Sequence, residues 1–378
     1  MNIKKDLFIS CLPGLEEVLG QEVQTLGYTF KKGRAGVFVP FQDMNQIYRL
    51  NLHLRTASRV LLPLAHYKCR NKADLYKGSL AVNWLPFFKD MPTFAIDSFV
   101  MHKDLTNSLF AAQVVKDGIC DQLKGQTGSR PSVDTSNPEL GLHVYIVDDM
   151  ATISFDTSNP PLHQRGYRVE GGVAPLRENL AASLLMLAGY TAEDTIVDPC
   201  CGSGTFLIEA AMIASKTAPG INRSSFGFFR HPDFSQEAWE KVRQEAIKQT
   251  VRLEPGKFFG IEESVKAYSI LKRAIHQSKF DRWIAVSNGD FRTMELPFEP
   301  TFVIANPPYG VRLSEVEELA DLYADLGDFL KQKTKKPAKG AIFTGSLDLA
   351  KCVGLKTTKR YVLSNGGIDC RLLTFDLY

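Results

Sequence analysis

The chain has 378 residues, which is too long for one ordinary hydrophobic core, so two or three domains are expected. No segment has the roughly 18 uncharged apolar residues of a membrane span, and the N-terminus lacks a signal-peptide pattern, so a cytoplasmic protein is expected. The seven cysteines form no C-x-x-C pair, so the sequence indicates neither a metal site nor a disulfide framework.

Positive charge is concentrated near the N-terminus. Residues 1–80 contain twelve Lys or Arg and six Asp or Glu, a net charge of +6 in a chain that is net +3 as a whole. A basic region joined to a mildly acidic remainder suggests contact with a nucleic-acid backbone, although a merely solvated basic face is the alternative. The candidate RNA-binding side chains of this region are Lys31, Arg34, Arg55, Arg59, Lys68 and Arg70.

Apolar spacing predicts a strand–helix–hairpin–helix order in the first 52 residues, which is typical of a ferredoxin-like unit. The expected elements are a strand at 7–9, a helix at 13–24, hairpin strands at 28–30 and 36–39, and a helix at 44–52. Further elements follow, with strands at 57–64, 94–100, 143–147 and 151–155 and helices at 73–82 and 108–123. The chain is expected to divide near residue 157.

A basic and aromatic segment lies just after this division. Its side chains His163, Arg165, Tyr167 and Arg168 are candidates for RNA contact, and a packed interdomain strand is the alternative. A helix is expected to start near Pro175. There, Arg177 could meet the carboxylate of an amino-acid ligand, pair with Glu178 or contact RNA.

Residues 195–210 predict a buried strand, a glycine-rich turn and a helix. Gly202 and Gly204 allow positive φ angles and close approach of the backbone to a ligand. The spacing does not match a dinucleotide-binding G-x-G-x-x-G motif or a phosphate-binding P-loop. Asp198 at the strand end suits a cationic amino group, which favours S-adenosylmethionine. The remaining cofactor-binding candidates in this turn are Cys200 and Thr205.

Two later strand ends carry further carboxylates. Glu262 is suited to ribose hydroxyls, Asp290 can accept from an adenine amino group, and Phe291 can lie against the adenine ring. Each acid alone could equally be a helix cap or a solvated turn residue. Carboxyl ends of parallel strands meet at one edge of an open sheet, so these side chains are expected near Asp198.

Asn306-Pro307-Pro308-Tyr309 follows the apolar run at 302–305, at another strand end. Two prolines fix two φ angles, so the turn holds an amide and backbone carbonyls rigidly. An exocyclic amino group needs such acceptors for its two N–H bonds, and the flat ring of Tyr309 offers a surface for stacking. This turn is therefore the candidate catalytic motif for methyl transfer to nitrogen, with a plain proline turn and helix cap as the alternative.

The whole chain resembles the bacterial THUMP-domain ribosomal RNA guanine-N2 methyltransferases. The most specific match outside the strand ends is residues 162–168 followed by 174–182. Weaker matches lie at 13–16, 54–60, 107–108, 116–119, 354–356 and 365–372. The resemblance implies an α/β fold, with a Rossmann-like seven-stranded class I methyltransferase domain at 157–378. It also implies a ferredoxin-like domain at 1–52 and a THUMP domain at 53–156.

The resemblance further implies S-adenosylmethionine as cofactor and N2 of a guanine in 23S ribosomal RNA as target. In the fused members of the family, the first half modifies guanine 2445. Because this chain ends at Tyr378, a stand-alone first half is expected, acting on ribosomal RNA or a large-subunit assembly intermediate. Three alternatives stay open: a transfer-RNA guanine-N2 methyltransferase, a DNA or protein-amide N-methyltransferase, and a non-catalytic RNA-binding protein.

Overall fold

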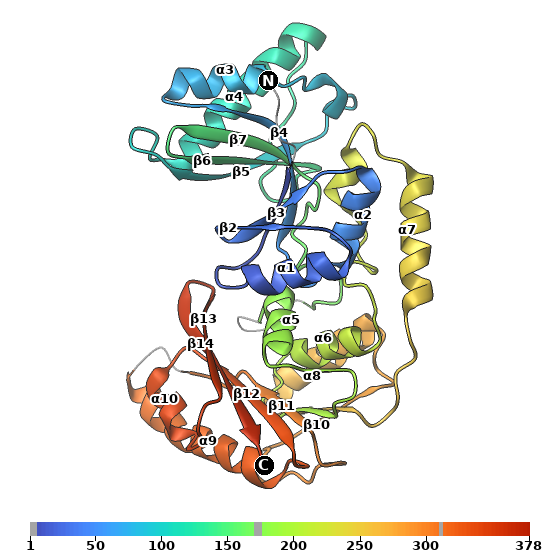
Figure 1. Cartoon of the computed structure of the whole chain (residues 1–378), viewed down its shortest axis with the longest axis vertical. Coiled ribbons are helices and arrows are strands. Elements are labelled where there is room, and N and C mark those ends of the chain that lie inside the picture. The colour runs from blue at the N-terminus through green and yellow to red at the C-terminus, as the bar shows by residue number, and fades with distance from the viewer. Residues whose placement is uncertain (1–5, 170–175, 310–312) are drawn as a thin grey trace.

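The structure, a computed structural model, describes residues 6–169, 176–309 and 313–378. Two seven-stranded sheets form the molecule, and they lie one above the other in Figure 1. The upper sheet belongs to the N-terminal half of the chain and the lower sheet to the C-terminal half. Among the described helices, none combines the length and apolarity needed to cross a membrane.

The N-terminal sheet has the strand order β2-β3-β1-β4-β7-β6-β5. Its strands are β1 (Asp6–Ser10), β2 (Lys31–Gly33), β3 (Gly36–Pro40), β4 (Arg59–Lys68), β5 (Phe94–Met101), β6 (Leu140–Val147) and β7 (Met150–Asp156). Strand β4 pairs with β1 on one side and β7 on the other. The ferredoxin-like unit and the region that follows it therefore share one strand.

Four helices accompany this sheet: α1 (Glu16–Thr25), α2 (Met44–His53), α3 (Lys72–Leu80) and α4 (Ser108–Thr127). Asp43 and Asn107 cap α2 and α4, since each side chain accepts from a backbone N–H three residues later. Side chains alternate across a strand, so Leu7 and Ile9 of β1 enter the core while Phe8 faces the other side of the sheet.

The predicted hairpin strand at 28–30 is wrong, because β2 begins only at Lys31. The side chain of Phe30 instead packs against α1, where a Cβ on Gly20 would lie 2.2 Å from its ring. The backbone N–H of Tyr28 donates to the Val23 carbonyl at the end of the same helix. Both residues serve to close the chain back onto α1.

The C-terminal sheet has the order β10-β9-β8-β11-β12-β14-β13, parallel except for the final hairpin. Its strands are β8 (Ile196–Asp198), β9 (Phe258–Glu262), β10 (Ile284–Asn288), β11 (Phe302–Ala305), β12 (Ala338–Thr344), β13 (Lys359–Asn365) and β14 (Ile368–Leu377). Its helices are α5 (Glu178–Leu187), α6 (Thr205–Ala214), α7 (Gln236–Gln249), α8 (Val265–Ser278), α9 (Leu313–Gln332) and α10 (Leu347–Cys352). The strand order reverses between β8 and β11, which is where open α/β sheets bind ligands. The predicted Rossmann-like fold class is confirmed.

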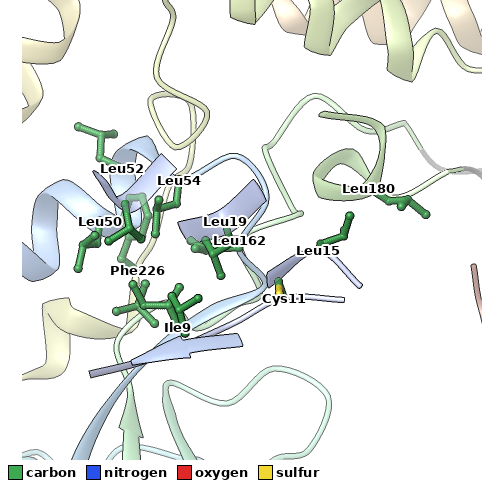
Figure 2. Close-up of a cluster of buried hydrophobic side chains, with 14 of the residues drawn as sticks. Ile9, Cys11, Leu15, Leu19, Leu50, Leu52, Leu54, Leu162, Leu180 and Phe226 are labelled. Carbon is green, nitrogen blue, oxygen red and sulfur yellow. The ribbon is translucent and has the colours of Figure 1, made fainter. Parts of the chain in front are cut away.

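The hydrophobic core is continuous across the junction of the two halves. Figure 2 shows Leu162 and Phe226 beside Leu19, Leu50 and other side chains of the first half. Helix α7 lies alongside α2 (Figure 1), and the ring of Tyr48 packs on Trp239 with centroids 6.1 Å apart. The two halves are therefore joined by an extensive packed interface rather than by a single linker.

Candidate active site

The turn after β8 holds a buried carboxylate. Asp198 is 1% exposed, and its Oδ1 accepts from the backbone N–H of Cys200 at 3.1 Å. No salt bridge to Asp198 exists among the described residues. Burial, reinforced by the negative charge of Glu262, raises the pKa of Asp198 to about 8. A cationic ligand group placed beside Asp198 would reverse this cost.

The two glycines of the turn both have positive φ, +53° at Gly202 and +78° at Gly204. A Cβ on Gly204 would lie 2.4 Å from Leu271 Cδ1, whereas a Cβ on Gly202 would meet open space. Thr205, the first residue of α6, has its hydroxyl 3.1 Å from that of Ser203. The space beside Gly202 is thus open, and ligand binding there stays a prediction.

Glu262 at the end of β9 is tied to the same turn. Its Oε2 accepts from the Gly202 N–H at 2.8 Å, and its Oε1 accepts from the Ser264 N–H at 2.9 Å. This arrangement brings the predicted residues Asp198, Gly202 and Glu262 together. The carboxylate of Glu262 also fixes the shape of the turn, a role that the sequence did not indicate.

Asp290 and Phe291 lie at the end of β10 but differ from expectation. The Asp290 carboxylate binds the Arg292 guanidinium, which lowers the pKa of Asp290. Phe291 is 5% exposed and packs edge-on against Phe329, with centroids 5.7 Å apart. The Phe291 ring therefore fills the core against α9, and its contact with an adenine ring stays a prediction.

Asn306 lies at the end of β11, which pairs with β8 directly beside Asp198. The Asn306 Oδ1 is buried, and it has no hydrogen-bond partner among the described residues. Pro307 is buried, whereas Pro308 is exposed at the surface of the turn. The motif thus presents an unused acceptor at the sheet edge that carries the Asp198 turn.

Tyr309 is half-buried beside the β13–β14 hairpin. Its hydroxyl accepts from Asn365 Nδ2 at 3.3 Å, and its ring would meet a Cβ on Gly345 at 2.9 Å. Burial raises the pKa of Tyr309, so its hydroxyl stays protonated. Asn365 and the close approach of Gly345 hold this ring in place. Asn365 lies in the segment 365–372 that resembles the family, but the sequence did not indicate its contact with Tyr309.

Arg55 and Arg165, two predicted RNA-binding residues, instead lie at the junction of the two halves, where Arg165 is buried and Arg55 is half-buried. Arg55 Nη2 donates to the carbonyls of Met212 and Thr217, at 3.1 and 2.7 Å. Arg165 is 1% exposed, donates to the carbonyls of Leu162 and Arg55, and lies 3.6 Å from Glu209. Both guanidinium groups therefore fasten the interface.

The rest of the segment at 162–168 divides between buried and exposed side chains, with Tyr167 buried and Arg168 exposed. The hydroxyl of buried Tyr167 donates to Glu209 at 2.8 Å, and Arg168 pairs with the buried Glu178 at 2.9 Å. Glu209 is a single carboxylate within the apolar helix α6, which was the available signal that it has a buried cationic partner.

The other basic candidates lie at or near the surface and differ in exposure and in ion pairing. Lys31, Arg34 and Lys68 are exposed. Arg70 pairs with Asp74 at 3.0 Å, and Arg59 is half-buried between Asp97 and Asp156. Arg177 is exposed at the N-terminus of α5, and Pro175 lies outside the described residues. Within the described ranges, no group of three His, Cys, Asp or Glu residues could hold a metal ion.

Comparison with known proteins identifies the domain that holds these strand ends. A family model described as "RMKL-like, methyltransferase domain" matches residues 165–374, which is more than half of the chain. The chain belongs to this methyltransferase family. Models for the "RlmL ferredoxin-like domain" and the "THUMP domain" match residues 6–61 and 69–156 of the same chain.

The curated relatives of this RMKL-like chain are about twice as long as the chain itself. The "Ribosomal RNA large subunit methyltransferase K/L" of Photobacterium profundum is 36% identical over 369 residues, 96% of this chain and 51% of the relative. The chain thus spans about half the length of the curated relatives it matches.

Two solved structures match the RMKL-like chain over nearly its whole length. A possible methylase from Clostridium difficile 630 has a TM-score of 0.86 and 30% identity, with 98% of each chain covered. SMU.472, a methyltransferase by description and complexed with SAH, has a TM-score of 0.85 and 26% identity, with 99% of this chain and 98% of that chain covered.

Proposed function

We propose that this chain is an S-adenosylmethionine-dependent RNA methyltransferase that modifies the exocyclic N2 of a guanine in 23S ribosomal RNA. The observation that carries the proposal is the buried Asn306 Oδ1, which has no partner among the described residues. An unpaired buried acceptor costs about 1–3 kcal/mol, so the site favours a ligand that brings an N–H donor. The amino group of a base supplies one.

The residues of the Asp198 turn fit the proposed cofactor. Asp198 is buried, and no cation pairs with it in the described part of the chain, which suits the amino group of the methionine part. Glu262 would accept from ribose hydroxyls, and the partly exposed Asp290 keeps lone pairs for the adenine amino group beside Arg292. Arg177 and Pro175 are the proposed contacts at the methionine carboxylate. When bound, S-adenosylmethionine supplies a methyl group on a sulfonium that needs no acid in order to leave.

The Asn306 turn would position the target base. Flipping a guanine out of its stack costs a few kcal/mol, and stacking on Tyr309 would offset about 1–3 kcal/mol of that cost. The Asn306 Oδ1 and the Pro307 carbonyl would accept from the N2 amino group and direct its lone pair toward the cofactor side. Pro308 keeps this turn rigid, and the surplus proton can leave to water after transfer. Positioning of this kind supplies up to about 7–11 kcal/mol of a barrier.

The choice of substrate rests on the relatives and on charge. The matching relatives are named for large-subunit ribosomal RNA, and the first 80 residues of this chain carry a net charge of +6. We assign 23S ribosomal RNA, free or in an early large-subunit assembly intermediate, as the partner, and guanine 2445 as the first site to examine. The proposed domain boundaries are 1–52, 53–156 and 157–378.

The test is to map N2-methylguanine in 23S ribosomal RNA from cells with and without this protein, by mass spectrometry of RNA fragments. One modified guanine should disappear without the gene and return with purified protein and S-adenosylmethionine. The Asn306→Ala protein should not restore it. Methylation of transfer RNA instead would establish the runner-up substrate, and RNA binding without any methyl transfer would establish a non-catalytic protein.

A further inference from the structure

The open face of the N-terminal sheet contains a cavity of about 460 Å³, far from the strand ends of the C-terminal sheet. Side chains from β1, β3, β4, β6 and β7 line it, together with Arg34 of the β2–β3 turn. Its volume falls within the range of about 300–1,000 Å³ that is usual for small-ligand sites. Nothing in the proposed function above uses this cavity.

The cavity walls are largely apolar and partly exposed. Phe8, Phe38, Tyr145 and Met150 line the cavity, and Phe38 and Met150 are 41% and 38% exposed. In the described part of the chain, the core packs on the other face of the sheet, where Leu7 and Val37 lie. Contiguous exposed apolar surface of this kind marks a binding site.

Several polar groups converge on the same apolar walls. His66 Nδ1 lies 2.9 Å from Thr152 Oγ1, and burial lowers the pKa of His143, so that ring is neutral near pH 7. A neutral imidazole has one donor and one acceptor, and the Asp6 carboxylate adds acceptors. Aromatic faces beside mixed donors and acceptors suit a flat heterocycle with polar edges, which describes a nucleobase.

Cations surround this face. Arg34 lies at the cavity and approaches Met101 Sδ at 3.6 Å, and no carboxylate pairs with it among the described residues. Lys31 stands opposite Phe38 and Lys68 opposite Met150 in the strand pairing, so both point to the open side. Arg59 is different, because Asp97 and Asp156 neutralise its charge. The free cations are therefore placed to meet phosphates on either side of a bound base.

We propose that this cavity binds an unpaired nucleobase of the RNA substrate, distinct from the methylated base, with Arg34 and Lys68 contacting the flanking phosphates. The inference rests on the proposed function only in taking RNA as the partner. A base inside a duplex cannot enter such a cavity, so the ligand is a single-stranded loop, bulge or end. An acidic peptide would use the cations but not the aromatic walls.

The test uses the full chain and a labelled single-stranded oligoribonucleotide of about ten nucleotides, within the range of about 4–16 nucleotides that single-strand sites cover. Phe38→Ala should weaken binding about tenfold, whereas Phe38→Tyr should keep most of the affinity because the ring remains. Arg34→Glu should weaken binding and flatten its salt dependence. The matched controls are Phe110→Ala and Lys124→Glu on α4, which are similarly exposed on another element and should bind normally.

A second measurement uses the unmodified protein. An oligoribonucleotide that carries 4-thiouridine should crosslink to residues of the open face, and a duplex of the same length should bind more weakly. Wild-type affinity in Phe38→Ala, preference for the duplex, no binding of the single strand, or crosslinks elsewhere would each overturn the inference. If the protein binds the single strand through this face but methylates no RNA, the proposed function fails while this inference stands.

Discussion

Two regions of the molecule bury charge, and they do so in opposite ways. At the junction of the two halves, Arg55 and Arg165 are surrounded by carbonyl oxygens and by Glu209. At the edge of the C-terminal sheet, Asp198 is equally buried, yet no cation pairs with it among the described residues. Burying an unpaired charge is costly, so the Asp198 carboxyl holds its proton to a higher pH than usual, which its pKa of about 8 expresses. The two regions therefore differ in whether the described residues supply an opposite charge to the buried group, rather than in burial itself.

The largest loss of stability is expected on substitution of Arg165. Arg165→Ala removes a guanidinium that donates to two carbonyls and leaves Glu209 buried without its cation, so the free energy of unfolding should fall by about 3–5 kcal/mol. Chemical denaturation monitored by circular dichroism measures this loss. Arg70→Ala, which removes an exposed pair with Asp74, is the control and should change stability little. An equally stable Arg165→Ala protein would contradict the structural role.

Substitution of Asp198 should raise the free energy of unfolding at high pH, whereas substitution of Arg165 lowers it. Its folded-state pKa of about 8 lies above the usual value of 3.8, so the folded state binds the extra proton and stability falls as pH rises between these values. The cofactor-free protein should lose roughly 2–3 kcal/mol of unfolding free energy between pH 6 and pH 9 through this group. Asp198→Asn should lack that loss and be the more stable protein at pH 9.

The same variant separates stability from function. Asp198→Asn should also bind S-adenosylmethionine more weakly, which calorimetry measures, because a neutral amide cannot pair with the amino group. A variant that is less stable than wild type at pH 9, or one that keeps full cofactor affinity, would show that Asp198 is a structural carboxylate.

Two asparagines, the buried Asn51 and the half-buried Asn306, provide a comparison. Asn51 donates to the Ile47 carbonyl and Thr157 and accepts from Ser158, whereas Asn306 Oδ1 has no partner in the described structure. Asn51→Ala should therefore cost about 1–3 kcal/mol of stability. Asn306→Ala should cost little stability but slow methyl transfer roughly 10²-fold through lost positioning. Parallel unfolding curves and single-turnover rates test both, and an unchanged transfer rate in Asn306→Ala would remove it from the catalytic motif.

The smallest effect is expected at the Tyr309 hydroxyl. Among the described residues, Tyr309→Phe removes the bond from Asn365, so turnover should fall by less than about tenfold, since a neutral hydrogen bond is worth about 0.5–1.5 kcal/mol. Tyr309→Ala also loses the ring and should be much slower. Asn365→Ala should add nothing in the Tyr309→Phe background, because the two changes remove the same contact. Full additivity in that double-mutant cycle would show that Asn365 acts elsewhere.

The sequence predicted the edge of the C-terminal sheet better than the basic N-terminal region, for a physical reason. Strand ends in a parallel sheet meet at one edge whatever the details of packing, so Asp198, Gly202 and Glu262 could be placed together from their local context alone. The position of the Arg55 side chain depends on two carbonyls in and after α6, and no local sequence pattern reveals these contacts. The packing of Phe291 could not be predicted either, since its partner Phe329 comes from a helix later in the chain.

Strand β4 has a consequence for how an RNA would be read. Strand β4 belongs to both parts of the N-terminal sheet, and contacts across the junction, such as those of Arg55 with the Met212 and Thr217 carbonyls, hold this sheet against the C-terminal half. The fold then fixes the distance between the open-face cavity and Asn306. An RNA that offers bases at both places must fold to that span, so its shape, rather than the sequence around the target, would select the nucleotide that reaches Tyr309.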